Sequence, residues 1–328
     1  MLKIGVFGAG QPGKIHIAHW KEVPGTELAG FYEPDDTIAA SAIEQFGLER
    51  YSDVDDLVAV IDLAVIATAT GAQFEIAKKC LLNQKHLFIE TPITRSLEEA
   101  AQLVKLVREA NVKCQVGHIE RYNPAFLALA NKPLQPMFIE AHRLAMFTPG
   151  DTNTSVIMDL MIHDIDMVLH MVKSPVRRIS ASGVAIVSET ADIANARIEF
   201  DNGCVANLTS SRISLKNMRK TRIFQQDAYI GIDFLEKKTE IVSLKDVEDS
   251  GSFPGMALEM PNGEKKVICV DAPGIGFSDP YRMELEEFAD AVLNDKPVRV
   301  SIYDGFQAMD VAEQVLKKMS SHNEMHNV

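Results

Sequence analysis

The chain reads LKIGVFGAGQPG at residues 2–13, an apolar run followed by glycines spaced as G-x-G-x-x-G. The apolar run predicts a buried strand, and residues 14–23 carry apolar side chains at helical spacing. Between a strand and a helix, the first glycine permits a tight turn, the second lets a pyrophosphate approach the backbone, and the third lets the helix pack closely. We therefore predict a dinucleotide phosphate site at Gly8, Ala9, Gly10, Gln11, Pro12 and Gly13.

The next apolar segment, residues 27–32, ends at the acidic residue Glu33. A carboxylate about 20 residues beyond the glycines accepts hydrogen bonds from the 2′-hydroxyl of an adenosine ribose and repels a 2′-phosphate. The sequence thus favours NAD over NADP. An ordinary glycine-rich turn is the alternative, and the strand, the helix and Glu33 in register disfavour it. Pro12 has no N–H, which removes one potential phosphate donor.

Composition excludes several classes of protein. The 328 residues are 46% hydrophobic and 24% charged, an ordinary composition with room for two domains. A formal charge of -13 argues against a nucleic-acid surface or an anionic membrane partner. The four cysteines form no C-x-x-C, so neither a zinc site nor a disulfide framework is indicated. Without a signal-type start or a bilayer-spanning apolar run, we expect a cytoplasmic protein that holds no metal.

Residues 1–121 alternate short apolar segments with helical patterns. The expected strands are 3–7, 27–32, 63–68, 86–90 and 113–117, and the expected helices are 14–23, 36–46, 54–60, 74–83 and 97–110. This alternation predicts an α/β domain with a doubly wound parallel sheet that binds ligands at the carboxyl ends of its strands. Thr68, Glu90 and His118 lie at such ends. We expect the cofactor to contact Ala67, Thr68, Ala69, Gln73, Glu90 and Thr91.

Residues 122–328 show a different pattern and predict an α+β domain for substrate binding and oligomerisation. One amphipathic helix is expected at about 156–172, and two more at 281–293 and 305–319. Strands are expected at 178–187, 194–200, 204–213, 222–226, 228–234, 239–244 and 265–270. The hairpin signal Asp201-Asn202-Gly203 between two of them indicates a mostly antiparallel sheet.

Asp159 and His163 are spaced i and i+4 on the first of these helices, which would place them on one helix face. A carboxylate beside an imidazole orients it and raises its basicity, as suits a general base near neutral pH. From the pair alone, an ordinary helix histidine beside a solvated acidic face is the preferred interpretation. A metal site of His163, Asp166 and His170 has helical spacing but no further ligand pattern to support it.

Taken in order along the chain, these segments resemble the Gfo/Idh/MocA family of oxidoreductases. The resemblance covers nearly the whole chain, and it rests on the glycines of residues 8–13, Glu33, Thr68, FIETP at 88–92, VGHIERYNP at 116–124, and Asp159 with His163. The stretch GHIERYNP is most similar to the branch of nucleotide-sugar 3-dehydrogenases that act on UDP-N-acetylhexosamines or their uronic acids.

The resemblance implies an N-terminal Rossmann domain and a C-terminal domain whose open-faced sheet forms homodimers or homotetramers. It implies His163 as the general base with Asp159 beside it. It also suggests residues on the substrate side of the site, which are His118, Arg121, Tyr122, Asn123, Arg143 and His163. For Arg121 and Arg143 a surface salt bridge is an equally good interpretation, because bidentate recognition by arginine depends on placement.

The chain departs from the family pattern near the expected reacting centre. Thr91 follows Glu90 where the family usually reads Glu-Lys-Pro, and Gln73 stands where many relatives carry histidine. Two functions stay open: an NAD-dependent dehydrogenase oxidising a secondary hydroxyl of a sugar or nucleotide sugar, and a cofactor- or sugar-binding oligomer with little turnover. Choice of sugar is expected to depend on the loops 145–155 and 247–261.

Overall fold

The computed structural model describes residues 1–148, 154–226, 228–246, 257–259, 263–274, 276 and 278–326. The chain divides into two compact units. The first comprises Met1–Tyr122 with Ser278–Asp310, and the second Asn123–Phe277 with Val311–Val328. The expected boundary after residue 121 placed all of 122–328 in one domain, whereas Ser278–Asp310 groups with the first unit. Parts of the two loops expected to select the sugar, 149–153, 247–256 and 260–261, lie outside the described residues.

The first unit is a doubly wound α/β domain, as predicted, with a six-stranded parallel sheet in the order β3-β2-β1-β4-β5-β6. This order is that of two mononucleotide-binding halves meeting between β1 and β4. The strands are β1 (Leu2–Phe7), β2 (Thr26–Tyr32), β3 (Arg50–Tyr51), β4 (Leu63–Ile66), β5 (His86–Ile89) and β6 (Cys114–Val116). The helices among them are α1 (Gln11–Trp20), α2 (Asp36–Phe46), α3 (Val54–Val60), α4 (Thr70–Leu82), α5 (Leu97–Ala110) and the 3-10 turn η1 (Ile119–Tyr122).

Side-chain caps explain where several of these helices begin. The carboxylate of Asp35 accepts the N–H groups of Thr37 and Ile38 at 2.8 and 2.9 Å, which fixes the start of α2. Asp53 and Ser96 cap α3 and α5 in the same way. Each cap follows a β-strand or an extended segment, so the polar residue that ends the extended stretch also starts the helix.

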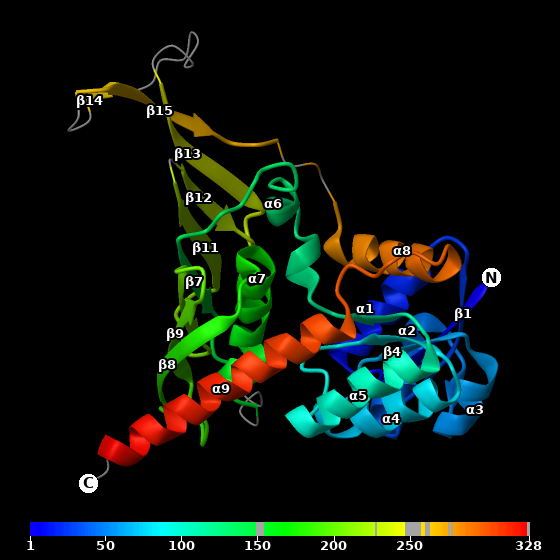
Figure 1. Ribbon diagram of the computed structural model, residues 1–328. Coiled ribbons are helices and arrows are strands. Elements are labelled where there is room, and N and C mark those ends of the chain that lie inside the picture. Colours follow the sequence, from blue (N-terminus) through cyan, green and yellow to red (C-terminus); the bar gives the residue numbers. More distant parts are fainter. Residues whose placement is uncertain are drawn as a thin grey trace. The chain divides into compact units, whose positions relative to one another are not determined.

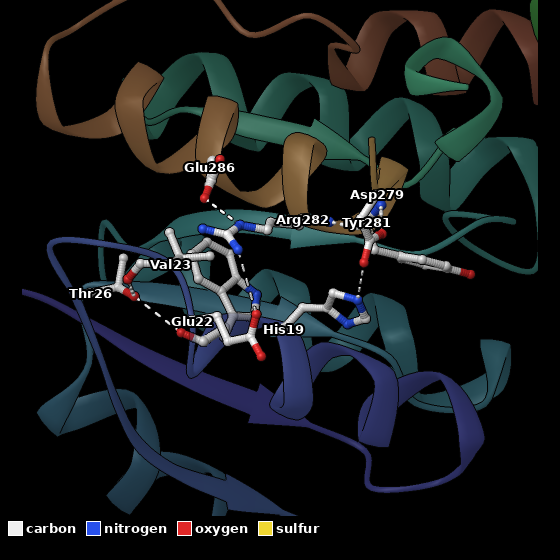
Figure 2. Close-up of polar contacts among 9 residues, drawn as sticks. His19, Glu22, Val23, Thr26, Asp279, Tyr281, Arg282 and Glu286 are labelled. Atoms are coloured by element: carbon white, nitrogen blue, oxygen red, sulfur yellow. Dashed lines mark hydrogen bonds and ion pairs between the residues drawn. The ribbon is translucent and has the colours of Figure 1, made fainter. Parts of the chain in front are cut away.

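Helix α8 (Pro280–Leu293) completes the core of the first unit although it is distant in sequence. Its Leu285 and Phe288 are fully buried in the same cluster as Ile4, Trp20 and Phe88. Polar contacts also tie α8 and its cap to α1, as Figure 2 shows: His19 Nε2 lies 3.1 Å from Asp279 Oδ2, and Arg282 lies 3.8 Å from Glu22. Because burial of these apolar side chains requires α8, the segment 278–310 belongs to this unit.

The second unit contains a nine-stranded sheet in the order β14-β15-β13-β12-β11-β7-β10-β9-β8. Its strands are β7 (Phe138–Leu144), β8 (Val176–Val184), β9 (Ile193–Phe200), β10 (Val205–Ser211), β11 (Met218–Gln225), β12 (Ala228–Asp233), β13 (Lys238–Asp246), β14 (Ala257–Glu259) and β15 (Lys265–Asp271). Neighbouring strands are antiparallel except β7 and β10, which are parallel. The prediction of a mostly antiparallel sheet is confirmed.

Strand β7 lies inside this sheet and was not expected from the sequence. It reads FIEAHRL, and its burial alternates so that Ile139, Ala141 and Arg143 face the interior. The period of two is present, but a histidine, a glutamate and an arginine dilute the apolar signal on which strand prediction depends. The buried arginine of this central strand, Arg143, needs a charged partner. Asp164, on the helix at Ile162–Val172, supplies it.

The helices of the second unit are α6 (Pro124–Leu127), the π-helical turn η2 (Ile157–Met161), α7 (Ile162–Val172) and the distal part of α9 (Ile302–His326). Helix α7 packs on β7 and β10, so one face of the sheet is covered by it (Figure 1). Ser301 and Asp304 bond each other's backbone N–H groups at the start of α9, a capping box. Among the described residues, none of the helices combines the length and apolar character that a membrane span requires.

Candidate active site

The glycines of the predicted cradle differ in what surrounds them. Gly8 has a φ of 96°, and a Cβ there would lie 2.6 Å from the carbonyl oxygen of Ala67. A Cβ on Gly13 would collide with the carbonyl oxygen of Gly8, while nothing lies within 4 Å of a Cβ on Gly10. Two glycines therefore serve close packing of backbone on backbone, and the middle one faces open space. A pyrophosphate cradle requires both kinds of glycine: some that allow tight packing of the turn and helix, and one that lets the phosphates approach the backbone.

Helix α1 begins at Gln11, three residues earlier than predicted, with Gly10 as its N-cap. Pro12 consequently lies in the first turn, where an N–H would have no acceptor within the helix. The missing donor costs the helix nothing, and Gln11 and Gly13 carry N–H groups in the same turn. A helix N-terminus thus starts at the cradle and favours an anion there.

Glu33 is buried and links the two turns at this edge of the sheet. Its Oε2 accepts the N–H of Ala9 at 2.8 Å, and its Oε1 accepts the N–H of Asp35 at 3.0 Å. Arg50 holds the same corner by donating to the carbonyl oxygen of Glu33 at 2.8 Å. Each carboxylate oxygen has a further lone pair, so Glu33 keeps acceptor capacity for ribose hydroxyls.

A cavity of about 580 Å³ opens beside these turns, within the size range of ligand pockets. It brings together seven of the predicted cofactor residues, which are Gly8, Gly10, Pro12, Glu33, Ala67, Thr68 and Ala69. The sequence did not point to the remaining lining residues, namely Tyr32, Pro34, Ile38, Val54, Ala72, Glu75 and Ile76. Tyr32 and Pro34 flank Glu33 and could have been added on that ground, whereas Val54 and Ile76 come from distant helices without any motif.

Unsatisfied polar atoms next to the cavity also fit a bound dinucleotide. In the described part of the chain, the hydroxyl of Thr68 and the side-chain oxygen of Gln73 are buried without a hydrogen-bond partner. Buried polar atoms usually have partners, and a ligand is one way to supply them. The open space at Gly10, the helix N-terminus and Glu33 together would hold the pyrophosphate and the adenosine ribose of NAD.

Glu90 and Thr91 follow β5 and do not line this cavity. Glu90 Oε1 lies 2.6 Å from His16 Nε2 on α1, and a Cβ on Gly117 would lie 2.5 Å from Glu90 Oε2. The carboxylate is therefore fixed from two sides at the carboxyl end of β5. The sequence placed Glu90 at a strand end but gave no signal for His16 as its partner.

Most of the GHIERYNP stretch is buried. His118 and Arg121 are buried, with the guanidinium of Arg121 3.6 Å from Asp304. Tyr122 is fully buried; its hydroxyl accepts from Gln115 Nε2 at 3.0 Å, and burial raises the pKa of the phenol. These contacts tie the residues of the stretch up to Tyr122 to the first unit, with Tyr122 acting as a core hydrogen-bond acceptor.

Two predicted substrate residues lie in the second unit and have structural partners. Asn123 caps α6 by accepting the N–H of Ala125, and it donates to the carbonyl oxygen of Phe234. Arg143 on β7 binds Asp164 on α7 in a bidentate pair, at 3.1 and 3.0 Å. Both members of this pair are buried, so the salt bridge is internal to the unit and not on the surface.

Asp159 and His163 do not lie on one regular α-helix as predicted. Asp159 is in the π-helical turn η2, and His163 is in the first turn of α7. A π-helical turn accommodates an extra residue, which changes the angular offset of side chains four positions apart. Asp159 is exposed and His163 half-buried, and π-helical turns are frequent at functional sites. In the described residues, no group of three or more histidine, cysteine, aspartate or glutamate side chains could hold a metal ion.

Comparisons with known proteins match both units. Residues 2–118 match the model of an oxidoreductase family with an NAD-binding Rossmann fold, and residues 135–230 match the GFO/IDH/MocA C-terminal domain. The UDP-N-acetylglucosamine 3-dehydrogenase of Acidithiobacillus ferrooxidans is 32% identical over 315 residues, covering 96% of each chain. The scyllo-inositol 2-dehydrogenase (NAD(+)) of Bacillus subtilis is 25% identical over 94% of this chain and 92% of its own.

A solved structure agrees with the sequence matches. The structure of the A. ferrooxidans UDP-N-acetylglucosamine 3-dehydrogenase GnnA superimposes with a TM-score of 0.86 at 30% identity, covering 98% of each chain. The similarity therefore extends over both units and not only over the common nucleotide-binding sheet.

Proposed function

Because the chain belongs to the Gfo/Idh/MocA family of NAD-binding oxidoreductases, we propose that it oxidises a secondary hydroxyl of a sugar or nucleotide sugar. A UDP-N-acetylhexosamine is the substrate class that the 32% identical relative favours. The observation that carries the proposal is the cavity beside Gly8, Gly10 and Glu33, whose open middle glycine and helix N-terminus suit a pyrophosphate.

NAD is the proposed cofactor in preference to NADP. The carboxylate of Glu33 lines the cavity and is held in place by the N–H groups of Ala9 and Asp35. A fixed negative charge at that position repels a 2′-phosphate and still accepts hydrogen bonds from ribose hydroxyls. When bound, the nicotinamide accepts the hydride from the carbon that bears the hydroxyl.

His163 is proposed as the general base that takes the hydroxyl proton, with Asp159 supporting it. The imidazole is half-buried and thus reachable by a ligand, and the π-helical turn directly before it sets Asp159 apart from the regular helix. Arg143 and Asp164 lie on β7 and α7, and their buried pair fixes the helix that carries His163 to the sheet. We therefore assign Arg143 a positioning role in this mechanism.

Replacement of His163 tests the mechanism. His163→Ala should lower turnover by about 10² to 10⁴-fold, the usual contribution of general base catalysis, and should leave NAD affinity nearly unchanged. NADH formation with a panel of UDP-sugars and free sugars measures the first, and calorimetry with NAD the second. His170→Ala, on the same helix, is the matched control. Full activity of His163→Ala would show that another group is the base.

A second function is favoured by one residue. Thr91 replaces the cation expected after Glu90, and a cation there would polarise a carbonyl or hold an alkoxide. A protein without it could bind cofactor and sugar with little turnover. Absence of NADH formation with every sugar tested, together with no gain in Thr91→Lys, would favour this binding function over the dehydrogenase.

A second copy of the chain is the proposed partner, bound through the sheet of the second unit to give a homodimer or homotetramer. Opposite to α7, the sheet presents an aromatic row in which Phe138 lies 6.0 Å from Phe224, and Phe224 5.2 Å from Tyr229. Phe224 is 38% exposed, and apolar side chains on an open sheet face are typical of an interface. Light scattering that finds only monomer at micromolar concentration would contradict this assembly.

A further inference from the structure

The end of β5 carries a cluster of ionisable side chains that the mechanism above leaves unused. His16 on α1, Glu90 after β5 and Glu284 on α8 belong to it, and all three lie in the first unit. His16 and Glu284 are each 1% exposed, whereas the side chain of Glu90 is 23% exposed. Glu90 is therefore the member of the cluster whose charge can interact with a bound ligand.

The cluster lies on the side of the sheet that would receive the nicotinamide. The cavity with Glu33 lies at the ends of β1, β2 and β4, which is the adenosine half of a sheet with this strand order. Dinucleotides bind across both halves of such a sheet at the carboxyl ends of the strands. The nicotinamide half of the dinucleotide would therefore lie at the ends of β4, β5 and β6. Glu90 follows β5 directly, with its N–H bonded to Ile66 on β4.

The hydrogen bonding of His16 indicates a neutral imidazole. Its Nε2 lies 2.6 Å from Glu90 Oε1, and its buried Nδ1 has no hydrogen-bond partner among the residues described. In an imidazolium both nitrogens are donors, and a buried charged N–H without an acceptor is costly. A neutral ring that donates through Nε2 leaves only an unprotonated nitrogen unsatisfied. His16 then anchors the Glu90 carboxylate without cancelling its charge.

The electrostatics of Glu284 and the groups around it can also be described. Burial raises the pKa of Glu284 well above its ordinary value, and the neighbouring Glu90 and Glu287 raise it further, which favours the neutral form of this carboxyl. Glu287 is paired with Arg299 at 2.9 Å. The phenol of Tyr122 beneath Arg299 is likewise neutral, since burial raises its pKa. Neither of these neutral groups cancels the negative charge of the Glu90 carboxylate.

We propose that the Glu90 carboxylate, fixed by neutral His16, makes this site bind the oxidised nicotinamide more tightly than the reduced one. The oxidised ring carries a positive charge that the reduced ring lacks, so a nearby carboxylate stabilises only the oxidised form. Thr91 in place of a lysine leaves this charge uncompensated. The inference rests on the proposed function, and it assigns Glu90 a role in loading the oxidised cofactor and releasing the reduced one.

The test compares dissociation constants for NAD+ and NADH, measured by calorimetry on the full-length protein. Glu90→Gln should weaken NAD+ relative to NADH by about tenfold. Thr91→Lys should move the ratio in the same direction while leaving the His16–Glu90 pair in place, which keeps the test usable if Glu90→Gln folds poorly. Glu109→Gln, an equal change of charge at the far end of α5, should leave the ratio unchanged.

His16→Gln distinguishes the protonation states, because glutamine retains an N–H donor and is neutral. An unchanged ratio supports neutral His16, and an increased preference for NAD+ would overturn it, since a cation would then have been removed. Equal weakening of both nucleotides in Glu90→Gln would mean a purely structural role and would overturn the inference while leaving the proposed function intact. A parent protein that binds neither nucleotide would instead contradict the proposed function.

Discussion

The two halves of the six-stranded sheet are built in different ways. In the adenosine half, Gly8, Gly13 and Glu33 come from one continuous stretch of chain, and each critical contact involves a backbone atom. In the other half, Glu90 is fixed by His16 and Gly117, which come from α1 and from the end of β6. The first half depends on local backbone geometry, whereas the second depends on side chains that only the finished fold brings together.

The largest expected effect comes from the adenosine half. Gly13→Ala should weaken NAD binding by at least about a hundredfold, or about 2.7 kcal/mol, and should lower the melting temperature, because its Cβ meets the rigid carbonyl of Gly8. Gly10→Ala is the matched control, since its Cβ has open space and its φ of -64° suits alanine. That variant should lose NAD affinity at unchanged melting temperature. Unchanged affinity in Gly10→Ala would mean that no phosphate lies there.

A smaller effect is expected for cofactor selectivity. Glu33→Ala should narrow the preference for NAD over NADP by about tenfold, because the carboxylate that repels a 2′-phosphate is removed. Glu27→Gln changes the charge at the opposite end of the same strand and should leave the preference unaltered. Calorimetric titration with both nucleotides decides it, and tighter binding of NADP by the parent protein would refute the assignment of NAD.

The corresponding glycine of the other half should tolerate substitution better. A Cβ on Gly117 meets the end of the Glu90 side chain, which can shift more readily than a backbone carbonyl. Gly117→Ala should therefore cost about 1 kcal/mol of folding stability, at the low end of overpacking costs. Denaturant unfolding of Gly117→Ala and Gly13→Ala, compared with the parent protein, measures the two losses of folding stability. A larger loss for Gly117→Ala than for Gly13→Ala would reverse the comparison.

A further prediction is a pH dependence of stability at Glu284. Burial raises its pKa in the folded state above the unfolded value, so the protonated carboxyl supports folding below about pH 4.5 and this support is lost as pH rises through the folded pKa. Glu284→Gln cannot ionise and should melt higher than the parent at pH 8, with the difference shrinking towards pH 5. A constant difference across this range would show that Glu284 does not titrate as its burial implies.

The same contrast explains what sequence could predict. The cradle, Glu33 and the order of strands follow from a local motif and from alternating patterns, so the fold class and half of the cavity lining were predictable. Three features could not be predicted, because each depends on a partner distant in sequence: the packing of α8 in the first unit, the contact of His16 with Glu90, and strand β7. The π-helical turn at Asp159 was also not predicted. One extra residue in a helix leaves the helical spacing of apolar side chains almost unchanged, so the sequence gives no signal for it.

The inclusion of α8 in the first unit has a consequence for synthesis. Trp20 and Phe88 emerge from the ribosome early, but Leu285 and Phe288, which share their core, follow only after residues 123–277 have been made. At about 5–20 residues per second, that delay is roughly 8–30 s. During this interval the nascent nucleotide-binding unit exposes an apolar surface where α8 will pack. A growing chain of this protein thus offers a transient, defined binding surface for a chaperone, which disappears when α8 docks.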